Sequence, residues 1–290
     1  MQFSLTNNLV IGSPSDPLVY LIAEALEESE YPFVIIDDLS SLQATINFNS
    51  SDCNIKLVTK EGAKTKLEHD SLIIYLYPII GNHRGVNWID KEYSVSEIRA
   101  MFSALLEMSQ GPVINRPSLG IDMKIWDRCE VRQLARQLGI PTYNEQLFKG
   151  AELAKIFENN ILLSVIDLSD HHNFLLYDQG QLDGEKMYFA GKWDAESEYI
   201  ICLKIDDRSF YFSYSHKSNM SYVELPLSSI EKYVGDLLGY FKLDIAFCVF
   251  IIDKMGPQFS FISTYSPVPL PIKVKEEIKS CLKKSSGCFH

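Results

Sequence analysis

The most polar stretch of this sequence that could carry out chemistry covers residues 167–173. It contains two carboxylates, Asp167 and Asp170, beside the adjacent histidines His171 and His172. Imidazoles beside carboxylates can bind a metal ion or move a proton near neutral pH. Adjacent residues of an extended chain point to opposite sides, however, so two neighbouring histidines rarely converge on one ion. We therefore interpret this segment as a solvated loop.

The six cysteines offer no clear reactive or metal-binding pattern. None belongs to a C-x-x-C pair or lies near histidines at zinc-binding spacing, which favours buried free thiols. Cys288 and His290 lie two residues apart at the end of the sequence, but two ligands in a fraying tail make a poor site. No Ser-His-Asp or Cys-His nucleophile pattern can be argued either. The residues alone thus indicate no catalytic group and no metal site.

Composition and charge exclude several classes of function. With 290 residues, 46% of them apolar and 12% aromatic, the chain can fill a large core without disulfides or metals. The net charge is −11 and the basic residues are scattered, apart from a short lysine-rich stretch at 273–284, which argues against a nucleic-acid partner. Apolar runs such as 245–252 are far shorter than the roughly 20 residues of a membrane helix, and the N-terminus lacks a signal-peptide pattern. We expect a cytoplasmic protein without a membrane partner.

The elements of the first third alternate between strand and helix. Residues 9–11 predict a short strand, and Asp16-Pro17 is typical of an N-cap followed by proline at the first helical position. Apolar residues then recur at helical spacing. Residues 33–36 and 71–76 are apolar runs without alternation, as in strands covered on both faces. This β-α-β order predicts an open, largely parallel sheet.

The rest of the chain has a different pattern. An amphipathic helix is predicted over 94–108 and a second helix over 124–138, which Gly139 and Pro141 end. Further strands, joined by polar turns, are predicted at residues 161–165, 174–177, 188–190, 199–205, 209–214, 246–252 and 259–264. Two more helices are predicted at residues 228–241 and 273–282. Parallel α/β first and antiparallel β with helices second indicate two architectures in one chain.

Five short strings, taken in order, carry a resemblance to a known family. They are VINRP at 113–117, DR at 127–128 with LARQLGIPT at 134–142, and KLDIAFCVFIIDKMG at 242–256 with FISTYSP at 261–267. The chain resembles ATP-grasp enzymes, in particular ligases that add glutamate to protein tails and ligases that macrocyclise microviridin-type (graspetide) peptides. The resemblance spans nearly the whole chain. It implies an α/β plus α+β fold: a pre-ATP-grasp open α/β domain at 1–117 and an ATP-grasp-like domain at 118–290, with lobes of about 118–190 and 191–290.

The metal ligands that this resemblance implies are missing from the sequence. ATP-grasp ligases form an acyl phosphate from a carboxylate and ATP, which an amine or hydroxyl then attacks. The charge of the triphosphate is neutralised by Mg²⁺, which prefers hard oxygen ligands, commonly carboxylates. The family's Asp, Glu and Asn ligands correspond here to Val249, Ser263 and Tyr265. Valine offers no oxygen and the two hydroxyls stay neutral, so we predict no metal site.

The nucleotide-binding residues are also altered. The family's first phosphate lysine corresponds to Arg128, which keeps the charge but not the point-like ammonium, and the second corresponds to Ser164. The glycine-rich loop has no counterpart in residues 167–173. Asn115 and Arg116 lie where the family places its interdomain cleft; Arg116 could hold a carboxylate or phosphate by two prongs, or form an interdomain salt bridge. Arg128, Asn115 and Arg116 remain the candidate cofactor-binding residues.

Two functions follow from the resemblance. The first is a catalytically degenerate ATP-grasp-like protein that binds a peptide or protein partner, such as an active ATP-grasp ligase, in a homo- or hetero-oligomer devoted to modifying ribosomally made peptides. It would have no catalytic residue and no cofactor. The alternative is a divergent ATP-dependent carboxylate–amine ligase, which would use Mg-ATP. The helix at 94–108 is a candidate interface, and the aromatic residues Tyr211, Phe212, Tyr214 and Tyr222 could face a peptide; burial in the core is the other interpretation for both.

Overall fold

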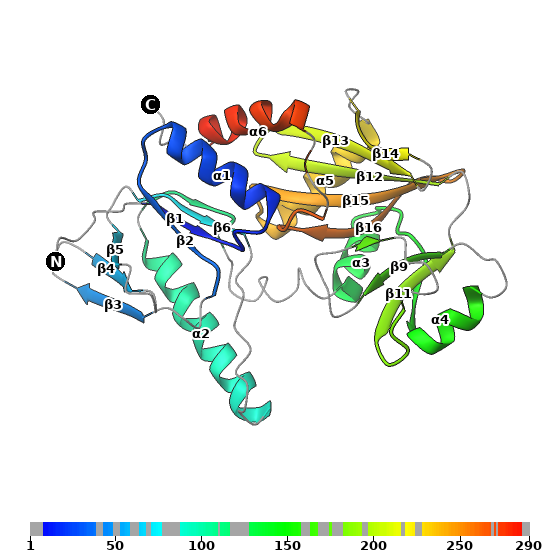
Figure 1. Cartoon of the computed structure of the whole chain (residues 1–290), viewed down its shortest axis with the longest axis horizontal. Coiled ribbons are helices and arrows are strands. Elements are labelled where there is room, and N and C mark those ends of the chain that lie inside the picture. The colour runs from blue at the N-terminus through cyan, green and yellow to red at the C-terminus, as the bar shows by residue number, and fades with distance from the viewer. Residues whose placement is uncertain are drawn as a thin grey trace. The chain divides into compact units, whose positions relative to one another are not determined.

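Figure 1 shows a computed structural model of the chain. It describes residues 8–38, 43–48, 53–58, 64–67, 71–76, 88–109, 111–116, 128–157, 163–167, 174–175, 182–192, 197–215, 218–223, 228–267, 270 and 272–285. Contacts group the chain into two compact units. The first contains Met1–Asp122, Lys242–Ile245 and Ile272–His290, and the second contains Met123–Phe241 and Ala246–Pro271. The domain limit expected after Pro117 stays a prediction.

The centre of the first unit is a parallel sheet. Its strands, in the order in which they lie side by side, are β2 (Phe33–Ile36), β1 (Asn8–Ile11), β6 (Ile73–Tyr75) and β7 (Val113–Ile114). All three neighbouring pairs are parallel. Every residue of β1 is buried, as expected for a strand covered on both faces. The open parallel sheet predicted for this part of the chain is confirmed.

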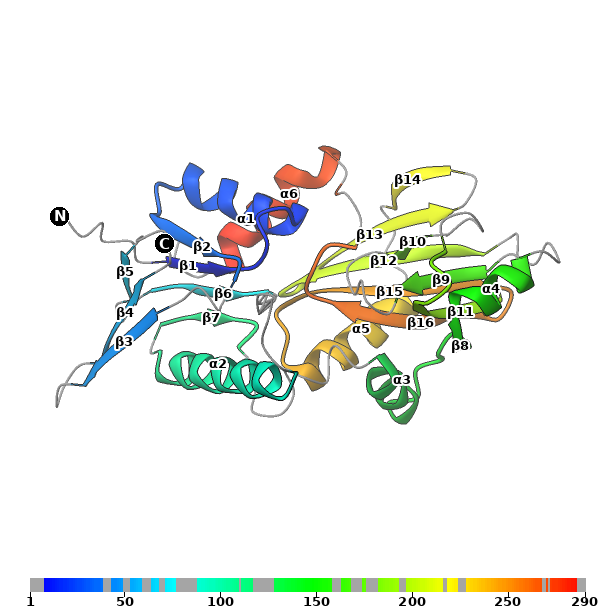
Figure 2. The ribbon, with the colours of Figure 1, turned by 60° about the horizontal axis from the view of Figure 1, so that its bottom comes forward.

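Helices cover both faces of this sheet, as Figure 2 shows. One face carries α1 (Pro17–Glu28) and α6 (Ile272–Ser285), and the other carries α2 (Trp88–Met108). Helix α1 begins as predicted, because the Asp16 carboxylate accepts a hydrogen bond of 2.8 Å from the Leu18 N–H. Helix α6 is held against α1 by Lys279, whose ammonium lies 2.6 Å from a Glu28 carboxylate oxygen.

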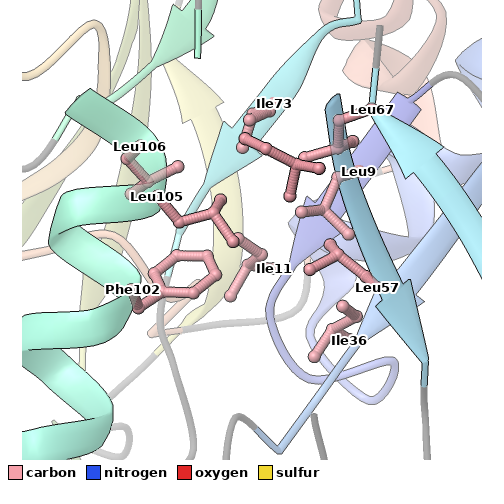
Figure 3. Packing of buried hydrophobic residues seen from close by; sticks show 10 residues of the cluster. Leu9, Ile11, Ile36, Leu57, Leu67, Ile73, Phe102, Leu105 and Leu106 are labelled. Carbon is pink, nitrogen blue, oxygen red and sulfur yellow. The ribbon is translucent and has the colours of Figure 1, made fainter. Parts of the chain in front are cut away.

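A small antiparallel sheet shares the core with α2. It consists of β3 (Gln43–Phe48), β4 (Cys53–Val58) and β5 (Lys64–Leu67). Figure 3 shows its leucines facing the parallel sheet and α2 within one cluster. The buried members of the cluster include Leu9, Ile11, Leu57, Leu67, Ile73, Phe102, Leu105 and Leu106. Phe102 and Leu105 are therefore core, whereas Met101 and Met108 on the same helix are half-buried. An interface on this helix stays a prediction.

The second unit contains two antiparallel sheets. The first, in spatial order, consists of β10 (Phe174–Leu175), β9 (Leu163–Asp167), β11 (Met187–Lys192) and β8 (Glu145–Lys149). The second consists of β14 (Ser218–Val223), β13 (Arg208–Ser215), β12 (Glu198–Ile205), β15 (Ile245–Asp253) and β16 (Gly256–Ser263). The helices are α3 (Arg128–Gln137), α4 (Gly150–Phe157) and α5 (Ser228–Phe241). Strands β15 and β16 form the antiparallel pair that the sequence predicted.

Aromatic residues fill the core of the larger sheet. Tyr211 is 3% exposed and Phe212 is fully buried, so these two belong to the core and cannot face a peptide. Helix α5 covers the sheet with Tyr233, whose ring stacks on Phe250 at 6.4 Å between centroids. None of the helices within the described ranges has the length and apolar character that crossing a bilayer requires.

Candidate functional site

A β-bulge in β16 directs two successive side chains toward one arginine. Val249 pairs with Phe261 while Phe250 pairs with Phe259, so Ser260 is an extra residue in its strand. Arg128, the first residue of α3, donates a 2.8 Å hydrogen bond to the Ser260 hydroxyl. Its guanidinium carbon also lies 4.7 Å from the centroid of the Phe261 ring. The bulge thus supplies both a polar and an aromatic contact.

The charge of Arg128 is balanced inside the same unit by Glu145 of β8. Two parallel hydrogen bonds join them, from Nε to Oε2 at 3.1 Å and from Nη2 to Oε1 at 3.0 Å. The Ser260 hydroxyl donates a third bond to Oε1 at 3.0 Å. The side chains are 12% and 1% exposed, respectively. Arg128, which is partly buried, therefore forms a two-pronged ion pair with a buried carboxylate and is not a free cation.

A second arginine on the same helix shares this carboxylate. Arg132, one turn after Arg128, has Nη1 3.6 Å from Oε2 of Glu145 and donates to the backbone carbonyls of Tyr143 and Glu145. Burial lowers the pKa of the Arg132 guanidinium, and Glu145 acts in the opposite direction. Its Nε has no hydrogen-bond partner among the described atoms. These three side chains carry one net positive charge.

Asn115 connects two segments of the first unit. It adopts a left-handed backbone conformation with φ 56°, which asparagine tolerates better than most residues. Its side-chain oxygen accepts hydrogen bonds from the N–H groups of Asp244 and Ile245, and its amide donates to the Ile245 carbonyl, all at 2.8 Å. Asn115 is 1% exposed. Its polar atoms are thus engaged by the chain itself.

Arg116 closes the end of helix α2. Its guanidinium donates to the carbonyl of Leu106 at 2.9 Å and to that of Ser109 at 3.5 Å. The last carbonyls of a helix have no partner within the helix, so a cation placed there is stabilising. The sequence suggested a two-pronged anion contact or a salt bridge for this residue; its described contacts are backbone carbonyls.

Val249, Ser263 and Tyr265, which the sequence resemblance assigns to the family's metal-ligand positions, lie in or just after β15 and β16. Val249 is fully buried and Ser263 is 2% exposed. The Ser263 hydroxyl donates to the Tyr265 carbonyl at 2.9 Å and accepts from the Tyr265 N–H at 3.0 Å. In the part of the chain that the structure describes, no group of three or more His, Cys, Asp or Glu side chains could hold a metal. The side chain of Ser164 and residues 168–173 lie outside the described residues.

A separate pocket of about 380 Å³ opens elsewhere in the second unit. Its lining comes from the two residues before β8 and from β8, β11 and the β15–β16 hairpin: Tyr143, Asn144, Gln146, Phe148, Ala190, Gly191, Asp253 and Gln258. Gly191 makes the packing of the Tyr143 ring possible, because a Cβ there would lie 2.4 Å from the Tyr143 Cε1 atom. Sequence reasoning missed this pocket, since strand β8 was not predicted.

The backbone of the chain is similar to several solved structures. A RiPP-associated ATP-grasp ligase of Chryseobacterium gregarium, in complex with ADP and a leader and core peptide, superposes with a TM-score of 0.64 at 14% identity, over 98% of this chain and 97% of that one. The macrocyclase MdnC of Microcystis aeruginosa MRC, bound with precursor peptide MdnA, gives 0.64 at 16% identity over 97% and 99%. The ATP-grasp ligase PsnB gives 0.63 at 12% identity over 98% and 100%. This chain has an ATP-grasp fold.

Sequence comparison adds nothing to this result, because no family model and no curated protein matches the chain. The ATP-grasp fold confirms the fold class expected from the short strings, and the strands that carry the corresponding ligand positions, β15 and β16, are formed as a hairpin.

The residues that the sequence resemblance assigns to the metal and phosphate positions do not fit magnesium-bound ATP. A buried valine cannot bind a cation, and the Ser263 hydroxyl is neutral and already paired with Tyr265. The guanidinium of Arg128 already has a carboxylate partner in Glu145.

Two residues of the site could not be found from the resemblance. Glu145 and Arg132 belong to none of the family strings. Hydropathy also predicts that a glutamate in a strand is exposed, so it could not indicate that Glu145 is buried. The available signal was the spacing of Arg128 and Arg132, which places both guanidinium groups on one side of α3.

Proposed function

We propose that this chain is a non-catalytic protein of ATP-grasp fold that binds a peptide or protein partner, as an accessory subunit of a peptide-modifying ligase. The observation that carries the proposal is the buried pair of Arg128 and Glu145. Nε and Nη2 of Arg128 already bond to Glu145, so a phosphate could make a two-pronged contact with this pair of nitrogens only by displacing the Glu145 side chain, which is 1% exposed. Separating a buried ion pair leaves an uncompensated charge and costs roughly 3–5 kcal/mol. This cost opposes nucleotide binding at the corresponding position.

The replaced ligand positions support the same conclusion. Val249, Ser263 and Tyr265 provide no carboxylate to hold the magnesium that a triphosphate requires. The alternative, a divergent ATP-dependent ligase, would need metal ligands from other positions.

The structurally similar proteins support a peptide partner. The Chryseobacterium ligase and MdnC were each solved with a peptide bound. A protein that keeps this fold without the nucleotide ligands could retain the peptide-binding function and act beside an active ligase. We propose association with such a ligase, its precursor peptide, or both.

Thermal unfolding with Mg-ATP tests the lack of nucleotide binding. A ligand at about 100 times its Kd stabilises a protein by roughly 2.7 kcal/mol. We expect no rise in Tm with millimolar Mg-ATP relative to Mg²⁺ alone. The matched control is Arg128→Gln, which should respond to Mg-ATP as the unmodified chain does. A rise in Tm that Arg128→Gln abolishes would support the ligase alternative instead.

Light scattering tests the accessory role. The purified chain is measured alone, then with a catalytically intact ATP-grasp ligase encoded beside it, and then with the precursor peptide of that ligase. We expect a complex with the ligase or the peptide and faster peptide modification in its presence. A strict monomer that binds neither would contradict the proposal and leave only the fold assigned.

A further inference from the structure

The pocket bounded by β8, β11 and the β15–β16 hairpin has one charged lining residue, Asp253. The Asp253 carboxylate accepts one hydrogen bond on each oxygen, from the Met255 N–H at 2.7 Å and from the Gln258 amide at 2.7 Å. Each carboxylate oxygen can accept a second bond. These two contacts fix the carboxylate in position and leave it capacity for another donor.

Aromatic rings and side-chain amides make up much of the remaining lining. Phe148 and Tyr143 provide the rings, and Asn144, Gln146 and Gln258 provide amide oxygens and N–H groups. Burial raises the pKa of the Tyr143 phenol, with smaller contributions from Glu145 and Asp253, so Tyr143 stays neutral at ordinary pH. The pocket therefore combines one fixed negative charge with aromatic faces and polar acceptors.

We propose that this pocket binds an organic cation, the ammonium or guanidinium group of a lysine or arginine side chain in a peptide. In naming a peptide as the carrier, the inference rests on the proposed function. A carboxylate and aromatic rings are the two kinds of group that attract such a cation. Donors of the cation would bond to Asp253 and the amide oxygens, while its alkyl stem packs on Phe148.

Other occupants satisfy this lining less well. An anion would face the negative charge of Asp253 without any basic lining residue to balance it. A neutral alkyl chain would bury the carboxylate and the amides without new hydrogen bonds, which costs free energy. A Ca²⁺ or Mg²⁺ ion requires several oxygen ligands, usually with more than one carboxylate. A volume of about 380 Å³ lies in the usual range for small-ligand sites and leaves room for adjacent peptide backbone.

Titration with three blocked amino acids followed by NMR tests the proposal. The probes are the Nα-acetyl N-methylamides of lysine, arginine and norleucine; the last has an alkyl chain of lysine's length and no charge. The two cationic probes should shift the backbone amides of Gly191 and Asp253. Norleucine should bind at least tenfold more weakly. Equal affinity for lysine and norleucine would overturn the proposal.

Two variants identify the pocket as the binding site. Asp253→Asn keeps an oxygen to accept from the Met255 N–H but removes the charge, and should weaken both cationic probes at least tenfold. The matched control is Asp236→Asn, an exposed position on α5 with the same change in net charge, which should leave binding unchanged. Equal affinities in Asp253→Asn and Asp236→Asn would overturn the proposal.

A third variant tests whether the probes bind at this pocket if Asp253→Asn does not fold. Gln146→Lys places a tethered ammonium at the pocket, where it should pair with Asp253 and abolish binding of the lysine probe. Unchanged binding in this folded variant would contradict the assignment. The probes are free small molecules and need neither ATP nor a ligase. A failure of the probes to bind can therefore be distinguished from a negative result in the ATP and ligase experiments, which test the proposed function.

Discussion

Replacing Glu145 by glutamine should destabilise the second unit severely. Glu145 receives two hydrogen bonds from Arg128 and one from Ser260, and lies 3.6 Å from Arg132. Glutamine retains one acceptor oxygen, so its new NH₂ group faces a guanidinium donor, and both arginines lose their counter-charge. Removing one partner of a buried ion pair costs roughly 3–5 kcal/mol. At about 2–4 °C per kcal/mol for domains of 150–250 residues, the Tm should fall by roughly 6–20 °C.

Circular dichroism during heating measures this effect, with Glu198→Gln as the control. Glu198 also accepts a side-chain hydrogen bond, from Ser213 at 3.2 Å, but it is exposed. Its replacement should change stability by less than about 0.5 kcal/mol. The double variant Arg128→Gln with Glu145→Gln should be less destabilised than the sum of the two single variants, because each single change leaves a charge behind. A loss below about 1 kcal/mol in Glu145→Gln would refute the argument that this carboxylate holds two buried cations.

Three further changes test the packing and the charges. Asn115→Ala removes the partners of the buried N–H and carbonyl groups of Ile245 and of the partly buried N–H of Asp244. Urea unfolding should therefore show a loss of at least about 3 kcal/mol, and a loss under 1 kcal/mol would contradict this. Gly191→Ala forces a Cβ to 2.4 Å from a tyrosine ring and should cost about 1–3 kcal/mol. By contrast, Gly235 lies on an exposed helix face, and a Cβ there would have no atom within 4 Å. Gly235→Ala should therefore stabilise the protein by about 0.5–1 kcal/mol. Similar Tm shifts for Gly191→Ala and Gly235→Ala would refute the close contact between Gly191 and Tyr143. Burial raises the pKa of the Cys202 thiol from 9.0 to about 12, so the folded state keeps a proton that the unfolded state releases above pH 9. Stability should fall as pH rises through this window, and Cys202→Ala should reduce the loss between pH 8 and pH 10 by on the order of 1 kcal/mol in urea titrations; an unchanged loss would count against the shift.

Elements with strong local signals could be predicted from the sequence. The Asp16-Pro17 start of α1 and the bounds of α5 at residues 228–241 are confirmed, because a cap and an apolar periodicity are encoded within a few neighbouring residues. The start of α2 was placed six residues too late, since residues 88–93 continue the helix without a recognisable cap or apolar repeat.

Strands stabilised by distant partners could not be predicted. Strand β8 begins with the buried Glu145, and its burial pattern shows no alternation. The carboxylate is buried because Arg128 and Arg132 on another element bond to it, which local propensity does not encode. Strand β14 is mostly polar and was missed for a similar reason. The short strings were enough to select Arg128 as a candidate, whereas its partner Glu145 and the pocket could be recognised only in the folded structure.

The position of α6 has a consequence for how the chain assembles during synthesis. Helix α6 belongs to the first unit, where Lys279 bonds to Glu28 of α1 and to Glu276, contacts that raise the pKa of its ammonium. The ribosome makes this helix only after it has synthesised the whole of the second unit, residues 123–241 and 246–271. The second unit can therefore complete its folding before α6 packs against α1. Until then, the apolar surface that α6 covers is exposed to chaperones and to aggregation.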